Sequence, residues 1–250
     1  MTNSEHITIG YDYDMWYDYG QKSPIRIDFS TKSNRQILCC GMSGAGKSYY
    51  TLRLIGAIVQ ALPNSEIYFA DYKQEDDFIF LRSCPRYYPY KKVTEALEIV
   101  YNKMQNRQSG EDKSRHPVIL VFDEYIAYIL SLQSIDKKTA SNMMNKISEI
   151  LMLGRSLNVK MLISCQRPDA AAFPTGSRLN FGVIAILGNT PKSTYEMLLP
   201  SAEYIEAIGE RKFRQGEGIV LLQGVDLHFI KVPTIYDMGK LQELCIKGLS

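Results

Sequence analysis

A glycine-rich segment constrains the fold of this chain more than any other feature. Residues 41–48 read Gly-Met-Ser-Gly-Ala-Gly-Lys-Ser, which is the G-x-x-x-x-G-K-S pattern of a phosphate-binding P-loop. The apolar run Ile37–Cys40 before it predicts a buried strand, and apolar residues follow it at helical spacing, namely Leu52, Ile55, Val59 and Leu62. A strand, a glycine turn and a helix start together predict a backbone site for phosphate.

The segment therefore predicts a nucleoside triphosphate site, with ATP and Mg²⁺ as the expected cofactors. Lys47 would reach the β- and γ-phosphates, and the hydroxyl of Ser48 would bind Mg²⁺. A chance glycine turn is the alternative, and the flanking strand and helix patterns argue against it. The residues that we expect around the nucleotide are Gly41, Met42, Ser43, Gly44, Ala45, Gly46, Lys47, Ser48 and Tyr49.

The composition fits one soluble α/β domain. The chain has 250 residues, 45% hydrophobic residues and a net charge of +2, and this balance favours neither nucleic acid nor another partner. No apolar run approaches the roughly 20 residues that span a bilayer, and the N-terminus lacks a signal-peptide pattern. The five cysteines form no C-x-x-C pair, so we expect buried thiols in a cytoplasmic protein without an intrinsic membrane span.

The first 34 residues differ in character from residues 35–250. Residues 11–19 alternate aromatic and acidic side chains and contain the single tryptophan. Such a segment is either an arm that docks on another protein or an edge hairpin packed on its own domain. We favour the hairpin because alternation is typical of a half-buried strand.

From residue 36 onward, strand-like runs alternate with helical ones. Apolar strands are predicted over 67–70, 118–122, 159–164 and 182–187, with helices around 93–104 and 143–151, a loop over 106–116 and a closing hairpin of 218–222 with 227–231. Strands that are apolar on both faces and separated by helices predict a mainly parallel sheet with helices on each side. The expected fold class is α/β.

An acidic pair follows the most apolar strand. Asp123 ends this strand, where it would hold the Mg²⁺ shell opposite Ser48, and Glu124 could act as general base toward an attacking water. A P-loop kinase needs no such glutamate, so the pair favours a hydrolase. The alternative is a strand-end carboxylate that caps a helix.

Three further positions carry weaker signals. Gln166 ends the next apolar strand, where it could report the γ-phosphate or simply satisfy a backbone carbonyl. Arg155 could lie near a phosphate across a subunit boundary, or it could complement the dipole at a helix C-terminus. Residues 71–73, Asp-Tyr-Lys, are more typical of a solvated turn than of a site.

Taken together, these segments resemble the FtsK/SpoIIIE branch of the FtsK–HerA ATPases. The resemblance rests on the P-loop, on Asp-Tyr-Lys at 71–73 where the family shows Asp-Pro-Lys, and on Val-Phe-Asp-Glu-Tyr at 121–125. Its most specific part is residues 154–168, which resemble the family's G-R-A-x-x-x-x-L-I-x-x-T-Q-R-P block with Cys165 in place of Thr. It covers roughly residues 34 to 235.

The resemblance implies a RecA-like (ASCE) P-loop motor domain over residues 35–250 with a C-terminal β-hairpin. It also implies a hexameric ring, which could form only on DNA, that moves double-stranded DNA by ATP hydrolysis. Carried over by position, the roles are nucleotide binding for Lys47, metal binding for Ser48 and Asp123, catalytic base for Glu124, γ-phosphate sensing for Gln166 and an interface arginine for Arg155.

The chain departs from the family at one interface motif. Members often show a D-S-R segment after the strand that follows Q-R-P, whereas residues 191–195 here read Pro-Lys-Ser-Thr-Tyr. Lys192 could substitute as a point charge, although less well than a planar guanidinium. The family's membrane segment and winged-helix DNA reader are also not found in this sequence, which favours a small motor domain of a mobile element, plasmid or virus.

A DNA motor needs lysines and arginines that contact phosphates without reading bases. The best candidates are Arg211, Lys212 and Arg214, which lie just before the closing hairpin. The pairs 91–92 and 137–138 are further candidates, and an ordinary solvated surface is the alternative for all of them.

The leading hypothesis is an ATPase that translocates double-stranded DNA in conjugative transfer, mobilisation or genome packaging. Its expected partners are duplex DNA, further copies of the chain, and a relaxase or another protein encoded by the same element. The alternatives are an FtsK-type ATPase that drives protein secretion and an ATP-binding adaptor that recruits a partner. Stimulation of ATP hydrolysis by duplex DNA would separate the translocase from both.

Overall fold

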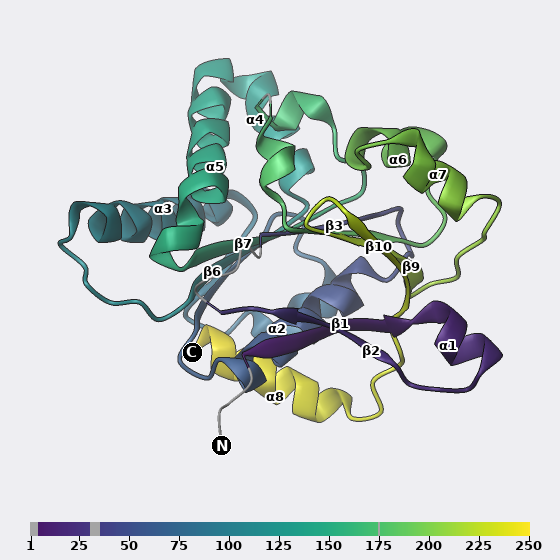
Figure 1. The fold of residues 1–250 in the computed structure, drawn as a ribbon. Coiled ribbons are helices and arrows are strands. Elements are labelled where there is room, and N and C mark those ends of the chain that lie inside the picture. Colours follow the sequence, from purple (N-terminus) through teal and green to yellow (C-terminus); the bar gives the residue numbers. More distant parts are fainter. Residues whose placement is uncertain (1–4, 31–35, 175) are drawn as a thin grey trace.

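One sheet organises the molecule (Figure 1). The computed structural model describes residues 5–30, 36–174 and 176–250, and in these parts ten strands form a single sheet in the order β2-β1-β10-β9-β8-β3-β7-β6-β4-β5. In chain order the strands are β1 His6–Asp12, β2 Pro24–Asp28, β3 Ile37–Gly41, β4 Glu66–Asp71, β5 Tyr87–Pro89, β6 Val118–Asp123, β7 Val159–Cys165, β8 Val183–Leu187, β9 Glu217–Leu222 and β10 Asp226–Lys231.

Eight α-helices connect or flank the strands in the described residues. They are α1 Tyr13–Asp18, α2 Lys47–Ala61, α3 Val93–Ser109, α4 Tyr125–Ile135, α5 Lys137–Leu157, α6 Lys192–Leu198, α7 Ala202–Ile208 and α8 Met238–Leu249. Short 3-10 helices span Asp76–Leu81, Tyr90–Lys92, Ala170–Ala172 and Ser177–Asn180. None of the described helices is long and apolar enough to cross a bilayer.

The sheet has a parallel part and an antiparallel flank. Strands β3 to β8 run parallel to their neighbours among themselves, whereas β9, β10, β1 and β2 each pair antiparallel with the next strand. Every residue of β3, β6, β7 and β8 is buried, as expected for parallel strands that are covered on both faces. The α/β class, the mainly parallel sheet and the closing β9–β10 hairpin are therefore confirmed.

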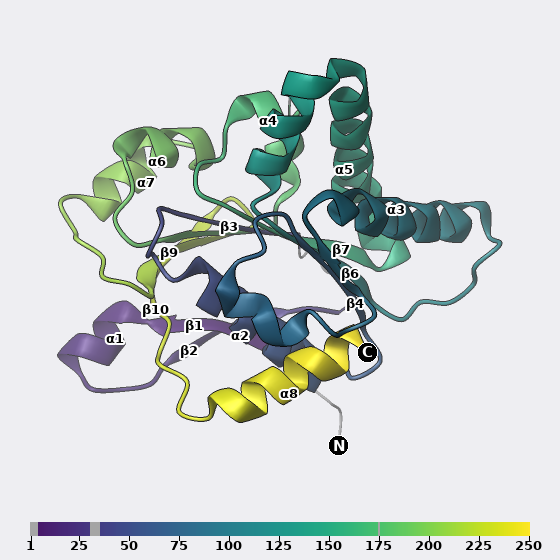
Figure 2. The same ribbon diagram turned by 180° about the vertical axis from the view of Figure 1, so that it is seen from behind.

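Helices cover both faces of the sheet (Figures 1 and 2). Helices α3, α4 and α5 lie on one face, where Val100, Ile129 and Ile147 join a core cluster with β6 and β7. Helices α2 and α8 lie on the other face, together with Ile7 of β1 and Ile27 of β2, in a second cluster. Helix α2, which follows the P-loop, thus packs between the sheet and α8.

The aromatic and acidic stretch does not form a strand along its whole length. Residues Tyr13–Asp18 are helix α1, because the Asp12 side chain accepts a hydrogen bond from Met15 N at 2.8 Å and caps the helix start. The alternating pattern also places aromatic residues four positions apart, and the rings of Tyr13 and Tyr17 lie 4.8 Å apart between centroids. On either side of α1, β1 and β2 pair with each other at the edge of the sheet.

Helix α3 extends further than its sequence pattern predicts. It continues to Ser109, four residues into the predicted loop, and ends where Gly110 adopts φ +85°. The domain division that we place between residues 34 and 35 lies outside the described residues. All five cysteines are buried free thiols, as expected.

Gly218 provides a test of how β8 and β9 pack. A Cβ atom at this position would lie 2.0 Å from the carbonyl oxygen of Ile186, so a side chain would push the two strands apart. We expect Gly218→Ala to lower the free energy of unfolding by about 2–3 kcal/mol. Gly239→Ala in α8, where the closest neighbouring atom would be 3.6 Å away, is the control and should be neutral or slightly stabilising. Urea denaturation would measure both, and an unchanged midpoint for Gly218→Ala would contradict this packing.

Candidate nucleotide-binding site

The P-loop joins the end of β3 to the start of α2. Its two inner glycines, Gly44 and Gly46, adopt φ +80° and +96°, a conformation that side-chain-bearing residues rarely adopt. Gly46 caps α2 without a side chain, so the helix N-terminus presents backbone N–H groups rather than a carboxylate. A Cβ on Gly41 would lie 2.7 Å from the carbonyl oxygen of Leu187, which shows how closely the loop packs on β8. This geometry suits an anion.

Lys47 is the first residue of α2 and is buried. Its Nζ donates to the carbonyl oxygen of Met42 at 3.4 Å, so the side chain curls back over the loop. The same Nζ lies 3.9 Å from Oε1 of Glu124 at the end of β6. The structure therefore brings together the predicted phosphate-binding lysine and the predicted general base.

Asp123 ends β6 at the same edge of the sheet and is almost fully buried. The Ser164 hydroxyl on β7 donates to its Oδ1, whereas its buried Oδ2 has no hydrogen-bond partner among the described residues. Burial raises the pKa of Asp123 to about 7, with the hydrogen bond from Ser164 opposing the shift and the charges of Glu124, Glu75 and Asp71 adding to it. A carboxylate this costly to bury is expected where a cation binds.

Glu124 separates β6 from α4 and adopts φ +53°. Glu124 occupies the N-cap position of α4, but its side chain makes no capping hydrogen bond, so the alternative of a carboxylate that caps the helix is not supported for Glu124. The carboxylate is 5% exposed, and besides Lys47 it contacts Lys73, whose Nζ is 3.2 Å from Oε1. A strained backbone that aims a buried carboxylate at two ammonium groups is typical of a functional position.

The residues around Ser48 fit a hard divalent cation. The Ser48 hydroxyl donates to Oε2 of Glu75 at 2.9 Å, and the negative charge of Glu75 also acts on Asp123. Hydroxyl and carboxylate oxygens are the donors that Mg²⁺ prefers, and the unpartnered Oδ2 of Asp123 offers one more within the described part of the chain. Ser48, Asp123 and Glu75 could together hold Mg²⁺, directly or through water.

A cavity of about 350 Å³ opens beside these groups. It is lined by Ser43, Gly44, Gly46, Lys47, Ser48, Tyr49, Leu52, Glu75, Asp77, Gln166, Gln215 and Met238. Gln166, which follows β7, thus lies in the same cavity as the P-loop, as the strand-end rule predicts. Leu52 and Met238 supply apolar surface beside the phosphate-binding backbone.

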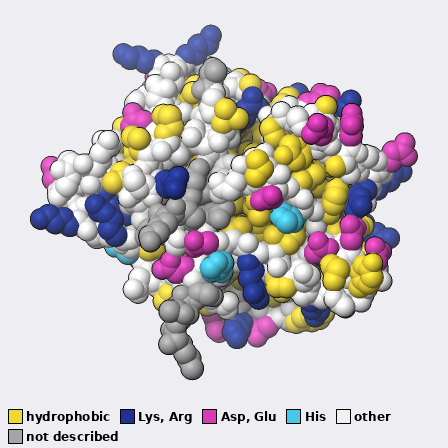
Figure 3. Space-filling view, in the orientation of Figure 1, with side chains coloured by type: hydrophobic (Ala, Val, Ile, Leu, Met, Phe, Trp, Pro, Cys, Tyr) yellow, Lys and Arg dark blue, Asp and Glu magenta, His cyan; other side chains and the backbone are white. Residues whose placement is uncertain are grey.

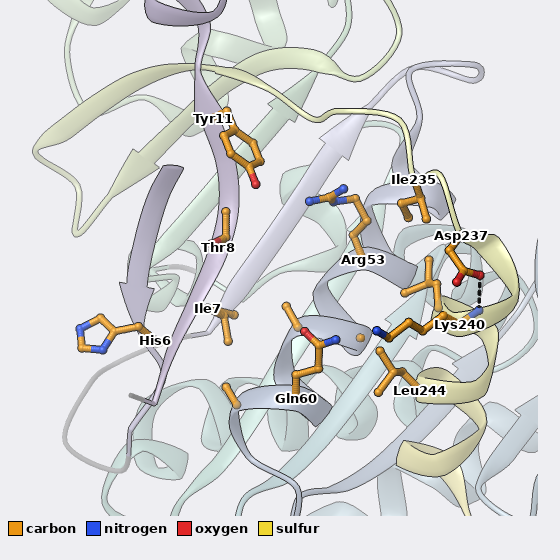
Figure 4. Close-up of a pocket in the computed structure, with 14 residues that line it drawn as sticks. His6, Ile7, Thr8, Tyr11, Arg53, Gln60, Ile235, Asp237, Lys240 and Leu244 are labelled. Atoms are coloured by element: carbon orange, nitrogen blue, oxygen red, sulfur yellow. Dashed lines mark hydrogen bonds between the residues drawn. The ribbon is translucent and has the colours of Figure 1, made fainter. Parts of the chain in front are cut away.

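A larger cavity, of about 570 Å³, lies between β1, α2 and the start of α8 (Figure 4). Arg53 and Gln60 of α2 and Lys240 of α8 reach into it, but none of the predicted site residues lines it. Its described lining includes no glycine loop and no carboxylate at the end of a parallel strand. The smaller cavity is therefore the candidate nucleotide site.

Arg155 lies away from this cavity within the same chain. It is an exposed residue in the last turn of α5, which leads into the first residue of β7. Gln166 follows the other end of β7, and seven residues of strand span about 20 Å. Arg155 could therefore act only on the nucleotide of another copy of the chain.

The site contains residues to which the sequence analysis assigned no role. Residues 71–73 are typical of a solvated turn, yet Lys73 contacts Glu124, and Glu75 two residues later contacts Ser48. The rule that ligands sit at the carboxyl ends of parallel strands could have identified both, because they follow β4 directly. Gln215 comes from the segment before β9, and no local pattern indicates its position in the cavity.

The three candidate DNA contacts precede Gln215, which lines the nucleotide cavity. The Arg211 side chain is already engaged by other residues of this chain. Its guanidinium donates a hydrogen bond to Oδ1 of Asp14 at 3.0 Å and lies 4.0 Å from the ring centroid of Phe229. Lys212 and Arg214 are exposed. Gly216, two residues further on, donates from its N–H to the carbonyl oxygen of Ala45 at 3.0 Å, so this segment rests on the P-loop.

Asp123 allows a test of how much the burial of its carboxylate destabilises the folded protein. Its folded-state pKa of about 7 lies above the ordinary value of 3.8, so the folded state loses stability as pH rises from 3.8 toward 7. We expect Asp123→Asn to raise the melting temperature of the nucleotide-free protein at pH 8 by about 2–4 °C, and by less at pH 5. Thermal denaturation would measure this, with Asp226→Asn on the exposed β9–β10 hairpin as the control. A lower melting temperature at pH 8 would contradict the assignment.

No family model matches the chain. Among curated proteins, 187 residues align at 27% identity with the FtsK domain-containing protein YdcQ of Bacillus subtilis (strain 168), which covers 67% of this chain and 37% of that protein. The chain thus spans little more than a third of the length of this relative.

Solved structures share the fold. The pCW3 conjugation coupling protein TcpA, in a monomer form with ATPγS, matches with a TM-score of 0.73 at 18% identity over 98% of this chain and 71% of that chain. The cytoplasmic domain of the Thermomonospora curvata type VII secretion ATPase EccC matches with 0.69 at 18% identity, over 99% and 31%. The genome packaging NTPase B204 of Sulfolobus turreted icosahedral virus 2 matches with 0.54 at 14% identity, over 80% and 100%. In sequence, this chain is thus similar to an FtsK domain-containing protein over two thirds of its length, and in fold it is similar to the domains of a conjugation coupling protein, a secretion ATPase and a genome packaging NTPase.

Proposed function

We propose that this chain hydrolyses ATP and uses the energy to translocate double-stranded DNA for a mobile element, a plasmid or a virus. The observation that carries the hydrolytic part is the acidic pair at the end of β6. Glu124 faces the P-loop lysine across 3.9 Å, and Asp123 keeps one buried carboxylate oxygen without a hydrogen-bond partner among the described residues. A nucleotide-binding switch would need no such buried, strained general base.

Each residue of the site has a role in this proposal. The backbone N–H groups of the P-loop and Lys47 bind the phosphates, and Gln166 contacts the γ-phosphate from the end of β7. Glu124 accepts a proton from the attacking water. Ser48 and Asp123, with Glu75 beside them, would hold Mg²⁺, which when bound would neutralise the charge that develops on the phosphates.

The DNA cargo is supported by the relatives and by the placement of basic residues. TcpA is a conjugation coupling protein and B204 is a genome packaging NTPase, and both share this fold. Lys212 and Arg214 are exposed on the segment that rests on the P-loop, so a duplex bound there would lie near the nucleotide. On the face in Figure 3, the basic side chains of the described residues are scattered among acidic ones and form no continuous patch. A few lysines and arginines could contact the phosphates of a duplex as it moves past, without a large basic surface that binds DNA nonspecifically.

Protein secretion is the second candidate function. EccC is a type VII secretion ATPase, and its TM-score of 0.69 is close to that of TcpA. A secretion ATPase would use the same phosphate chemistry, so the nucleotide site does not separate the two. The response to duplex DNA does.

The first test concerns the nucleotide site itself. Lys47→Ala should abolish ATP binding, because it removes the only lysine of the P-loop. Glu124→Gln should retain binding and lower kcat by at least about 100-fold, because an amide cannot accept the proton. Calorimetric titration and phosphate release would measure these effects. Lys240→Ala, in the larger cavity, is the control and should behave as wild type. Turnover that survives Glu124→Gln would show that another residue is the base.

The second test concerns the cargo. ATP hydrolysis should rise several-fold with duplex DNA, and light scattering should show a larger assembly of the chain when duplex is present. The double variant Lys212→Glu with Arg214→Glu should weaken duplex binding at low salt and reduce the salt slope by about 2, because it removes two cations that pair with phosphates. Exposed Lys240 and Lys247 of α8 provide the matched double charge reversal, which should leave binding unchanged. Hydrolysis that is indifferent to duplex would favour secretion or an adaptor role.

A further inference from the structure

The turn after β4 carries two side chains into the nucleotide site. We call residues Asp71 to Glu75 the β4 turn. Lys73 reaches Glu124, with 3.2 Å between Nζ and Oε1, and Glu75 accepts a hydrogen bond from the hydroxyl of Ser48. Both contacts come from a segment that lies between the P-loop and the acidic pair in the sequence, so the turn links the two halves of the site.

Several hydrogen bonds hold the β4 turn in place. Asp71 is fully buried, and its Oδ1 accepts a hydrogen bond from Gln74 N at 2.7 Å. Its Oδ2 accepts a hydrogen bond from the Tyr87 hydroxyl at 2.5 Å. Gln74 adopts φ +58°, and its carbonyl oxygen accepts a hydrogen bond from Arg82 at 3.1 Å. Backbone strain of this kind persists only where the surroundings over-determine it.

Aromatic packing fixes the other side of the turn. The ring of Tyr72 stacks on Tyr90 with 5.5 Å between centroids and meets Tyr128 edge-on at 5.6 Å. Tyr128 belongs to α4, the helix that begins directly after Glu124. The backbone around Lys73 is thus held by the contacts of Asp71, Tyr72 and Gln74, and the Lys73 side chain reaches Glu124 from this fixed turn.

The two lysines that contact Glu124 have different expected duties. Lys47 Nζ lies 3.9 Å from Oε1, but the phosphates of a bound nucleotide would compete for this ammonium group. Lys73 lies closer, at 3.2 Å, and belongs to the β4 turn rather than to the P-loop. When Lys47 binds phosphate, Lys73 remains as the cation beside a carboxylate that is 5% exposed.

We propose that Lys73 is a positioning residue for Glu124, the general base under the function proposed above, on which this inference rests. Its ammonium group attracts Oε1 as an ion pair at 3.2 Å, while Oε1 has no hydrogen-bond partner among the described residues, so this charge sets the direction of the carboxylate. Oε2 then accepts the proton of the water whose oxygen attacks the γ-phosphorus, while the bond from phosphorus to the bridging oxygen breaks and ADP leaves. Lys73 touches neither the water nor the phosphate in this scheme and acts only through Glu124.

The experiment compares Lys73→Met and Lys73→Arg with the wild-type chain. We expect Lys73→Met to lower kcat for ATP about 10- to 100-fold, because a misoriented carboxylate accepts the proton of the attacking water less efficiently. KM and the Kd for ATP should change less than about threefold. Lys73→Arg should recover most of kcat, because a guanidinium can still reach the carboxylate.

The matched control lies at the opposite end of β4. Lys103 pairs with Glu66 at 3.0 Å and has a side-chain exposure of 32%, against 3.2 Å and 34% for Lys73. Lys103→Met therefore removes a similar ion pair far from the nucleotide, and kcat should stay at the wild-type value.

A double variant tests whether Lys73 acts through Glu124. If it does, Lys73→Met combined with Glu124→Gln should hydrolyse ATP no more slowly than Glu124→Gln alone in single-turnover measurements. Further loss in the double variant, loss of nucleotide binding by Lys73→Met, or an unchanged kcat would each overturn the proposal. Failure of the proposed function has a different signature, because the wild-type chain itself would then not hydrolyse ATP.

Discussion

The contact between Lys47 and Glu124 is the interaction on which the rest of the site depends. It joins the start of α2 to the end of β6, and the strand that precedes α2, β3, is separated from β6 in the sheet by β7. Parallel strands make this possible, because β3, β7, β6 and β4 all end at one edge and each delivers its following residues there. Ser164 of β7 ties the edge together through Asp123.

The same arrangement has a stability cost. Asp123 is buried with a pKa raised to about 7, and Asp71 is buried beside it with its pKa raised by burial. Glu124 and Gln74 adopt positive φ angles that cost of order 1–3 kcal/mol each. These features are destabilising in the folded chain, and the cores on both faces of the sheet must offset them. Such a concentration of costs at one sheet edge is expected of a site built to bind cations and anions together.

The N-terminal segment is physically connected to this edge. Tyr17 of α1 donates its hydroxyl hydrogen to buried Glu217 at 2.5 Å, at the start of β9. Gly216, the residue before it, donates to the carbonyl oxygen of Ala45 in the P-loop. The segment of β1, α1 and β2 thus packs on the element that contacts the nucleotide loop, although it is distant from the loop in the sheet order.

Local patterns in the sequence determined the P-loop, the order of strands and helices, and the acidic pair after β6, because each depends on neighbours within a few residues. The same patterns gave the wrong element at residues 13–18. The aromatic side chains there repeat every two residues, as in a strand, but they also lie four residues apart, as on one face of a helix. The hydrogen bond that caps the helix at Asp12 favours the helix. Only the tertiary structure decided that Lys73 and Glu75 belong to the site, that Gln215 lines the cavity and that Arg155 lies beyond its reach in the same chain. The reason is that strand pairing and the packing of loops over a sheet edge bring together residues whose distance in space bears no relation to their spacing in the chain.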